Sequence, residues 1–207
     1  MENSITYIIA QKITKLKPGT IVVQEDFRAH GSATAINMAL SRLTSKGKIT
    51  RLAHGIYYKP KKDPLLGELL PSAHQVADTI ARKNRIQIRP SGMYALHKLG
   101  LSTQVPTRMV YLTNGQRREI RIGKTVIIFK PTTAKKMALK GPISSLVIQA
   151  LEELGTLDLS EEVQQRLMDF LYKENPVLLK NDLALAPAHI YDFVFHLLKR
   201  NNDGMVR

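Results

Sequence analysis

Apolar residues in the first 31 positions fall into short stretches with distinct spacings. Isoleucines at positions 5, 8, 9 and 13 share one face of a helix predicted over residues 4–15, with Ser4 as its N-cap. Pro18-Gly19 then interrupts the chain, and the β-branched run 20–23 predicts a short strand. Residues 24–29, anchored by Phe27, predict a second short helix that ends near Gly31.

A third helix is predicted to begin after Ser32 and to end at Lys46-Gly47. Its apolar residues recur every three or four positions and form one buried stripe. The opposite face carries short, nearly uncharged side chains, which can approach base edges and phosphates closely. We therefore predict a recognition helix, although a merely solvated face is the alternative. Its DNA-contacting residues are predicted to be Thr34, Asn37, Met38, Ser41, Arg42 and Ser45.

Residues 48–52 and 55–59 predict two strands joined by a turn at 53–55, with Ile49 and Ile56 pointing inward. The basic side chains of this hairpin and the preceding turn suit contacts to phosphates or an adjacent minor groove. They are Lys46, Lys48, Arg51, His54 and Lys59. The order helix, strand, helix, helix, hairpin predicts a winged helix-turn-helix over residues 1–60 that binds duplex DNA. A winged helix can instead serve as a protein-interaction module.

Residues 61–71 are polar and bounded by prolines, and we interpret them as a linker to a second domain at 72–207. Asn114-Gly115 separates the apolar runs 109–113 and 116–122, which predicts a two-residue hairpin and an antiparallel sheet, with a third strand at 125–130.

The remaining predicted elements of the second domain are helices at 72–83, 91–99, 144–154, 161–172 and 188–200, and a strand at 85–89. The predicted fold class is thus α+β, with a winged helix-turn-helix followed by a second α+β domain that has a small antiparallel sheet and C-terminal helices.

The charge distribution favours nucleic acid as a partner. The chain carries 31 Lys and Arg against 17 Asp and Glu, a formal net charge of +14. Residues 1–60 contribute +6 (nine minus three), residues 61–140 contribute +12 (sixteen minus four), and residues 141–207 contribute −4 (six minus ten). Such a field attracts polyanions. A basic patch is predicted in the second domain at Arg117, Arg118, Arg121 and Lys124, where nucleic acid, an acidic protein surface and plain solvation all remain open.

Other function classes find little support in the sequence. Gly123-Lys124-Thr125 resembles the end of a phosphate-binding loop, but Arg118 stands where that motif needs its first glycine. His189, Asp192 and His196 lack the i, i+4 histidine pair that faces one metal ion. There is no cysteine, no apolar run near the roughly 20 residues of a membrane helix, and no leader-like N-terminus. We therefore expect a cytoplasmic protein that is not an enzyme and uses no metal, cofactor or membrane.

Two stretches carry a family resemblance. The pattern Gly-x-Ile-x-Arg-Leu-x-x-Gly-Ile-Tyr at residues 47–57, together with residues 39–43, resembles the N-terminal winged helix of AbiEi-type antitoxins. Residues 90–106 and 111–115 resemble the start of the C-terminal domain in a related uncharacterised bacterial family. The resemblance implies an antitoxin of a type IV toxin–antitoxin system.

Such an antitoxin represses its own operon and counteracts a nucleotidyltransferase toxin. The implied partners are double-stranded DNA of its own promoter, expected to contain an inverted repeat, and the cognate toxin. Two alternatives stay open. One is a protein-interaction module that neutralises the toxin while DNA binding is incidental, and the other is an RNA-binding protein that uses residues 117–121.

Overall fold

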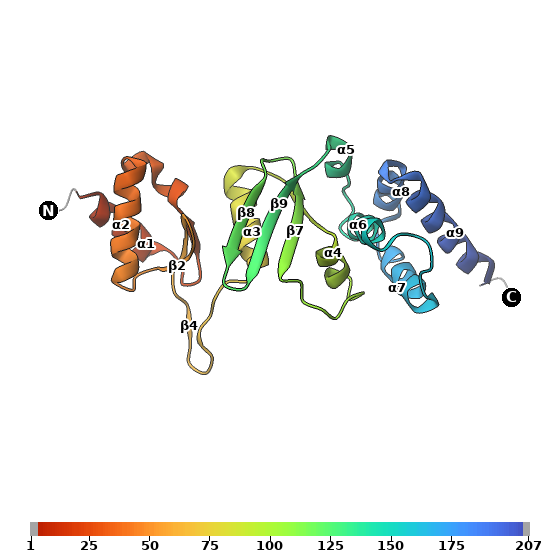
Figure 1. The fold of residues 1–207 in the computed structure, drawn as a ribbon, viewed down its shortest axis with the longest axis horizontal. Coiled ribbons are helices and arrows are strands. Elements are labelled where there is room, and N and C mark those ends of the chain that lie inside the picture. Colours follow the sequence, from red (N-terminus) through yellow and green to blue (C-terminus); the bar gives the residue numbers. More distant parts are fainter. Residues whose placement is uncertain (1–3, 205–207) are drawn as a thin grey trace. The chain divides into compact units, whose positions relative to one another are not determined.

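The computed structural model describes residues 4–204, and the chain divides into two compact units (Figure 1). The first unit comprises the residues up to Arg85 together with Ile120–Lys124, and the second comprises Ile86–Glu119 and the chain from Thr125 onward. The helix after the expected linker at 61–71 therefore groups with the N-terminal unit.

The N-terminal unit begins with alternating helices and strands. They are α1 (Ile5–Lys15), β1 (Ile21–Val23), the 3-10 helix η1 (Gln24–His30), α2 (Ala33–Ser45), β2 (Thr50–Ala53) and β3 (Ile56–Tyr58). Both predicted N-caps are confirmed, because Ser4 Oγ accepts from Tyr7 N at 3.2 Å and Ser32 Oγ accepts from Ala35 N at 3.3 Å. The strands form an antiparallel sheet in the order β1-β3-β2.

One apolar core holds these elements together. The inward stripes of α1 and α2 meet Val22 and Phe27, and these side chains are almost wholly removed from water. Ile49 and Ile56 are 1% and 0% exposed, which confirms their predicted inward orientation. Burying apolar area in this way supplies most of the free energy that offsets the ordering of the chain.

A second, narrower hairpin follows where only a linker was expected. It consists of β4 (Lys62–Asp63) and β5 (Gly67–Glu68), paired Lys62 to Glu68 and Asp63 to Gly67. Figure 1 shows it extending away from the helices of its own unit. The helix α3 (Ala73–Asn84) then begins at Ser72, whose hydroxyl and backbone N–H form a capping box with Gln75.

Four strands, most of whose residues belong to the second unit, form a sheet whose order was not predicted. They are β6 (Ile88–Ser91), β7 (Arg108–Thr113), β8 (Arg118–Ile122) and β9 (Thr125–Pro131), with α4 (Met93–Lys98) between β6 and β7, and the strand order is β6-β7-β9-β8. Strand β7 pairs antiparallel with β6 but parallel with β9, where Tyr111 lies opposite Phe129. This sheet is therefore mixed, and the predicted Asn114-Gly115 hairpin between β7 and β8 is wrong.

The local geometry of Asn114-Gly115 explains that error. A two-residue turn of the type favoured by Asn-Gly needs positive φ at both positions, and neither residue has it. Asn114 Oδ1 instead accepts from Gln87 N at 2.8 Å, and Gly115 N donates to Thr113 Oγ1 at 3.0 Å. A side chain at 115 would collide with Ile86 at 2.8 Å. The pair therefore closes the end of the β6–β7 ladder.

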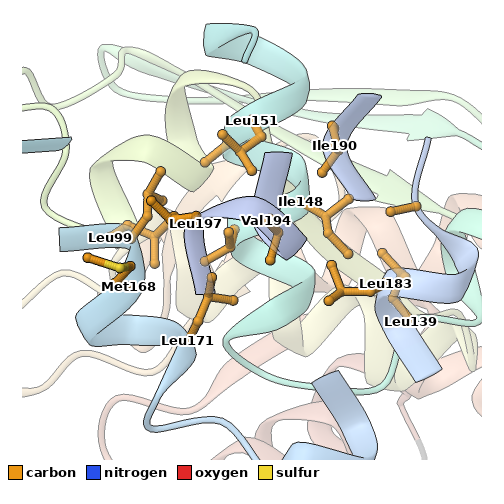
Figure 2. Packing of buried hydrophobic residues seen from close by; sticks show 14 of the residues in the cluster. Leu99, Leu139, Ile148, Leu151, Met168, Leu171, Leu183, Ile190, Val194 and Leu197 are labelled. Atoms are coloured by element: carbon orange, nitrogen blue, oxygen red, sulfur yellow. The ribbon is translucent and has the colours of Figure 1, made fainter. Parts of the chain in front are cut away.

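A group of helices follows the sheet, and all but the first of them share a second apolar core. They are α5 (Ala134–Met137), α6 (Ser144–Leu154), α7 (Glu161–Leu171), α8 (Pro176–Leu185) and α9 (Ala188–Gly204), of which α5 and α8 were not predicted. Figure 2 shows Ile148 and Leu151 on α6 beside Val194 and Leu197 on α9. The coarse prediction of a mixed α and β protein with small antiparallel sheets and C-terminal helices is confirmed.

Candidate nucleic-acid interface

The outer face of α2 presents the polar side chains that the sequence places there. Thr34, Met38, Ser41, Arg42 and Ser45 are exposed and Asn37 is half-buried, while Ile36, Ala39, Leu40 and Leu43 on the other face are at most 3% exposed. Met38 stands out because this large apolar side chain is 52% exposed. The helix is thus fixed along one stripe and free to contact a ligand along the other.

Four of the five predicted hairpin and turn residues lie open to solvent. Lys46 and Lys48 flank the end of α2, and Arg51 and His54 lie on the β2–β3 hairpin. The guanidinium of Arg51 is 3.3 Å from His54 Nδ1 and donates a long bond of 3.4 Å to Ala53 O. These contacts aim both side chains at the turn of the hairpin without neutralising the arginine.

Lys59 has a different environment from the other predicted contacts. Its Nζ donates to Thr14 O and to Leu16 O, both at 2.8 Å. These carbonyls lie at the C-terminal end of α1, where helices lack intrahelical donors and where a cation is favoured by the helix dipole. The structure therefore ties Lys59 to α1, a role that its sequence position did not indicate.

The stretch of chain that forms this surface contains cations and no carboxylates. Between Asp26 and Asp63 the chain has no carboxylate but eight Lys and Arg residues. Asp26 itself accepts hydrogen bonds from Val23 N and from the ammonium of Lys83. The residues of α2 and the β2–β3 hairpin therefore offer a polyanion cations and neutral dipoles. The carboxylate bonded to this sheet comes from outside the stretch, because Glu68 accepts from Thr50 Oγ1 on β2.

The predicted second basic patch lies on β8 and the turn that follows it. Arg117, Arg121 and Lys124 are exposed, Arg118 is half-buried, and Ile120 is 5% exposed. Neighbouring residues of a strand point to opposite faces, so the exposed Arg121 lies on the face opposite to the buried Ile120.

Sequence reasoning missed a buried carboxylate pair in the second unit. Asp182 on α8 accepts from Lys140 N and Gly141 N, both at 2.8 Å, while Glu174 accepts from Ile143 N and Ser144 N at 2.8 and 2.9 Å. The Ser144 hydroxyl bridges them, at 2.6 Å from Asp182 Oδ2 and 3.3 Å from Glu174 Oε2. The two carboxylates thus satisfy amide groups at and before the start of α6.

The ionisation of Glu174 reflects this environment. Burial opposes its charged form, yet the amide and hydroxyl donors outweigh that effect and hold the pKa of Glu174 below its ordinary value. Gly141 is needed here, because a Cβ at that position would lie 2.5 Å from Glu174 Oε2. All of these contacts serve the fold, so we assign the pair a structural role.

A smaller polar cluster anchors the β4–β5 hairpin. Glu68 accepts from Thr50 Oγ1 at 3.0 Å and from the hydroxyl of Tyr58. Burial, together with the bond to Glu68, raises the pKa of Tyr58 to about 12, and these same bonds lower the pKa of Glu68. The hairpin is therefore bonded at its base to the β2–β3 sheet.

The described part of the chain contains neither a cluster of metal-binding side chains nor a helix that could span a membrane. Among the described side chains, those of residues 4–200, no three His, Asp or Glu residues gather in an arrangement that could hold a metal ion. Over the same residues, no helix has both the length and the apolar character that crossing a bilayer requires.

Comparison with known proteins places the chain in a family. No curated protein matches it. Among solved structures, the crystal structure of RV2827C protein from Mycobacterium tuberculosis is similar, with a TM-score of 0.51, 15% sequence identity, and coverage of 96% of this chain and 76% of that chain. At this identity the likeness concerns the fold alone. A family model matches residues 8–179, and the chain therefore belongs to the family of unknown function DUF6088.

Proposed function

We propose that residues 4–60 form a winged helix-turn-helix that binds duplex DNA and that the protein is a transcriptional regulator. In this proposal α2 enters the major groove, and the β2–β3 hairpin is the wing that contacts the flanking backbone. The observation that carries it is the exposed polar face of α2 beside the exposed Lys46, Lys48 and Arg51, in a 36-residue stretch without a carboxylate. A helix exposed only to water would have no need of that one-sided composition.

The proposed target is the protein's own promoter, read as an inverted repeat. Two copies of the N-terminal unit would then occupy two half-sites whose spacing follows the helical repeat of DNA. Ser41 and Arg42 are assigned to base edges or nearby phosphates, and Lys48, Arg51 and His54 to the backbone. Contacts of the second type fix the register of the protein without reading sequence.

Protection mapping on the region upstream of the gene, at two salt concentrations, tests this proposal. We expect a protected segment with twofold-related halves, and we expect binding to weaken steeply as salt rises, because released counterions drive phosphate contacts. Absence of protection at low salt, where an unrelated duplex of equal length is also not bound, would refute DNA binding.

The C-terminal helices support a second part of the proposal, an antitoxin role against a nucleotidyltransferase toxin. Tyr191 and Phe195 on α9 are 42% and 52% exposed, and their rings stack at 6.1 Å. Exposed aromatic side chains are enriched at protein interfaces. Co-expression with an adjacent nucleotidyltransferase gene tests this role, with Tyr191→Ala and Phe195→Ala expected to abolish both rescue of growth and co-purification.

A further inference from the structure

The β4–β5 hairpin ends in two leucines that the fold does not use. Leu65 and Leu66 are 94% and 76% exposed, although leucine is among the residues most often buried in proteins. A single exposed leucine needs no explanation, but two adjacent leucines at the tip of a projecting hairpin form a small apolar patch that is exposed to water.

The backbone of the hairpin holds this tip in one conformation. Asp63 Oδ1 accepts from Leu65 N at 2.9 Å and from Leu66 N at 3.0 Å, and these bonds lower the pKa of Asp63. Gly67 closes the turn with a φ of 74°, a conformation that glycine adopts without strain. Leu69 N donates to Lys61 O at 2.8 Å, which extends the ladder toward the base. These bonds fix the path of the backbone that carries both leucines.

The charge of the N-terminal unit as a whole favours a polyanionic partner. The hairpin itself is balanced, because the lowered pKa values of Asp63 and Glu68 keep both carboxylates ionised beside two lysines. Lys61 and Lys62 are exposed on the strand that leads to the tip. Residues 4–85 carry fourteen Lys and Arg against five Asp and Glu, a balance of +9.

We propose that the hairpin is a wedge whose leucines enter the minor groove and insert at a base step of the bound DNA, while Lys61 and Lys62 contact the adjacent phosphates. Apolar side chains used in this way partly unstack neighbouring base pairs, and the larger protein surface that the bent DNA then touches offsets the cost of unstacking. The four residue steps from Lys61 to Leu65 span up to about 13 Å, which exceeds the roughly 7.5 Å depth of the minor groove. This inference rests on the proposed DNA binding.

Permanganate oxidation of thymines tests the wedge, since this reagent attacks thymines that have lost a stacking neighbour. The DNA is the upstream fragment on which protection is mapped. For the wild-type protein we expect reactive thymines at the edge of the protected segment. For Leu65→Ala with Leu66→Ala we expect the protection to remain at higher protein concentration, the thymine reactivity to vanish, and the affinity to fall about tenfold.

The salt dependence of binding should not change in that double variant, because no cation is removed. The matched control is Leu70→Ala with Leu157→Ala, which removes two other leucines that are 65% and 83% exposed. The control should behave as the wild type. Since all four side chains are exposed, neither variant opens a cavity in a core.

Protection without reactive thymines in the wild type would overturn the wedge and leave DNA binding intact. Unchanged thymine reactivity in the Leu65 and Leu66 variant would do the same. A change in sedimentation of that variant without DNA, together with unchanged DNA binding, would assign the tip to a protein contact instead. A wild-type protein that protects no DNA refutes the proposed function, and the wedge with it.

Discussion

Replacing Lys48 and Arg51 with alanine removes two exposed cations next to the polar face of α2. The formal net charge falls from +14 to +12, one unit for each substitution. Arg51 has only long contacts within its own hairpin and Lys48 is exposed, so we expect the fold to tolerate both changes. Any effect on DNA binding then reports on contacts to DNA.

The expected magnitude follows from the two cations that would no longer face a phosphate. Each phosphate contact contributes about 0.9 to the slope of log affinity against log salt, so two contribute about 1.8. Raising the salt concentration fourfold, from about 50 to 200 mM, should therefore reduce the ratio of the wild-type DNA affinity to the variant DNA affinity about twelvefold. Fluorescence anisotropy with a labelled duplex at four or five salt concentrations measures both slopes.

A control variant separates local contacts from overall charge. Lys180→Ala with Lys199→Ala removes the same two charges from exposed positions on α8 and α9. Its slope should match that of the wild type. Equal slopes for the wild type and the Lys48 and Arg51 variant would refute the assignment of these residues, and an equal loss in the control would mean that net charge alone drives binding.

Three further predictions follow from the same surface and from the buried carboxylates. Ser41→Ala with Arg42→Ala should reduce the preference for the promoter over an unrelated duplex by about 1–3 kcal/mol for each base contact removed, measured by competition; an unchanged ratio would contradict a reading role. Lys59→Met should lower the free energy of unfolding in urea by about 1–3 kcal/mol and leave the salt slope of DNA binding unaltered, because its ammonium binds α1. The pKa of Glu174 is lower in the folded chain than the ordinary 4.5, so its contribution is complete above that pH and is lost as pH falls below it. The Glu174→Gln variant should therefore have a lower free energy of unfolding than the wild type at neutral pH, and this free energy should fall less when the pH is lowered. Acid-unfolding curves that run parallel for the two proteins would exclude this carboxylate as a source of acid sensitivity.

Local signals predicted the elements whose formation depends on neighbouring residues. Ser32 and Ser72 begin helices as N-caps, since a hydroxyl three residues before a free amide suffices for that bond. The buried stripe of α2 was also predictable from the sequence, because the helical period brings its residues to one face. Consequently the polar face opposite that stripe was also predictable.

Partners far apart in sequence were not predictable in this way. Asn114-Gly115 has the composition of a tight turn, but Asn114 accepts a hydrogen bond from Gln87, which lies 27 residues earlier and directly before β6. Lys59 looked like a wing cation because nothing nearby reveals that its acceptors lie 43 and 45 residues upstream. No local pattern singles out Glu174 and Asp182 either, because the amides that Asp182 binds lie 41 and 42 residues earlier.

The β4–β5 hairpin was missed because it buries nothing. Its strands have two residues each, too few for an alternating apolar pattern, and the prolines at 60 and 64 are typical of a linker. A signal was nevertheless present in Asp63 followed by Gly67, since an Asp side chain can cap a turn and glycine can close it.

The carboxylates that cap α6 also affect the order in which the parts of the chain can fold during synthesis. The ribosome adds Glu174 and Asp182 between 30 and 42 residues after the amides that they bind. In a growing chain, the amide groups at the start of α6 therefore lack these hydrogen-bond acceptors until α8 has been synthesised. Domains tend to fold as units in order of synthesis. Most of the N-terminal unit is thus available while the C-terminal helices are still incomplete, and a chain shortened before residue 182 would expose apolar surface of the second core to proteases.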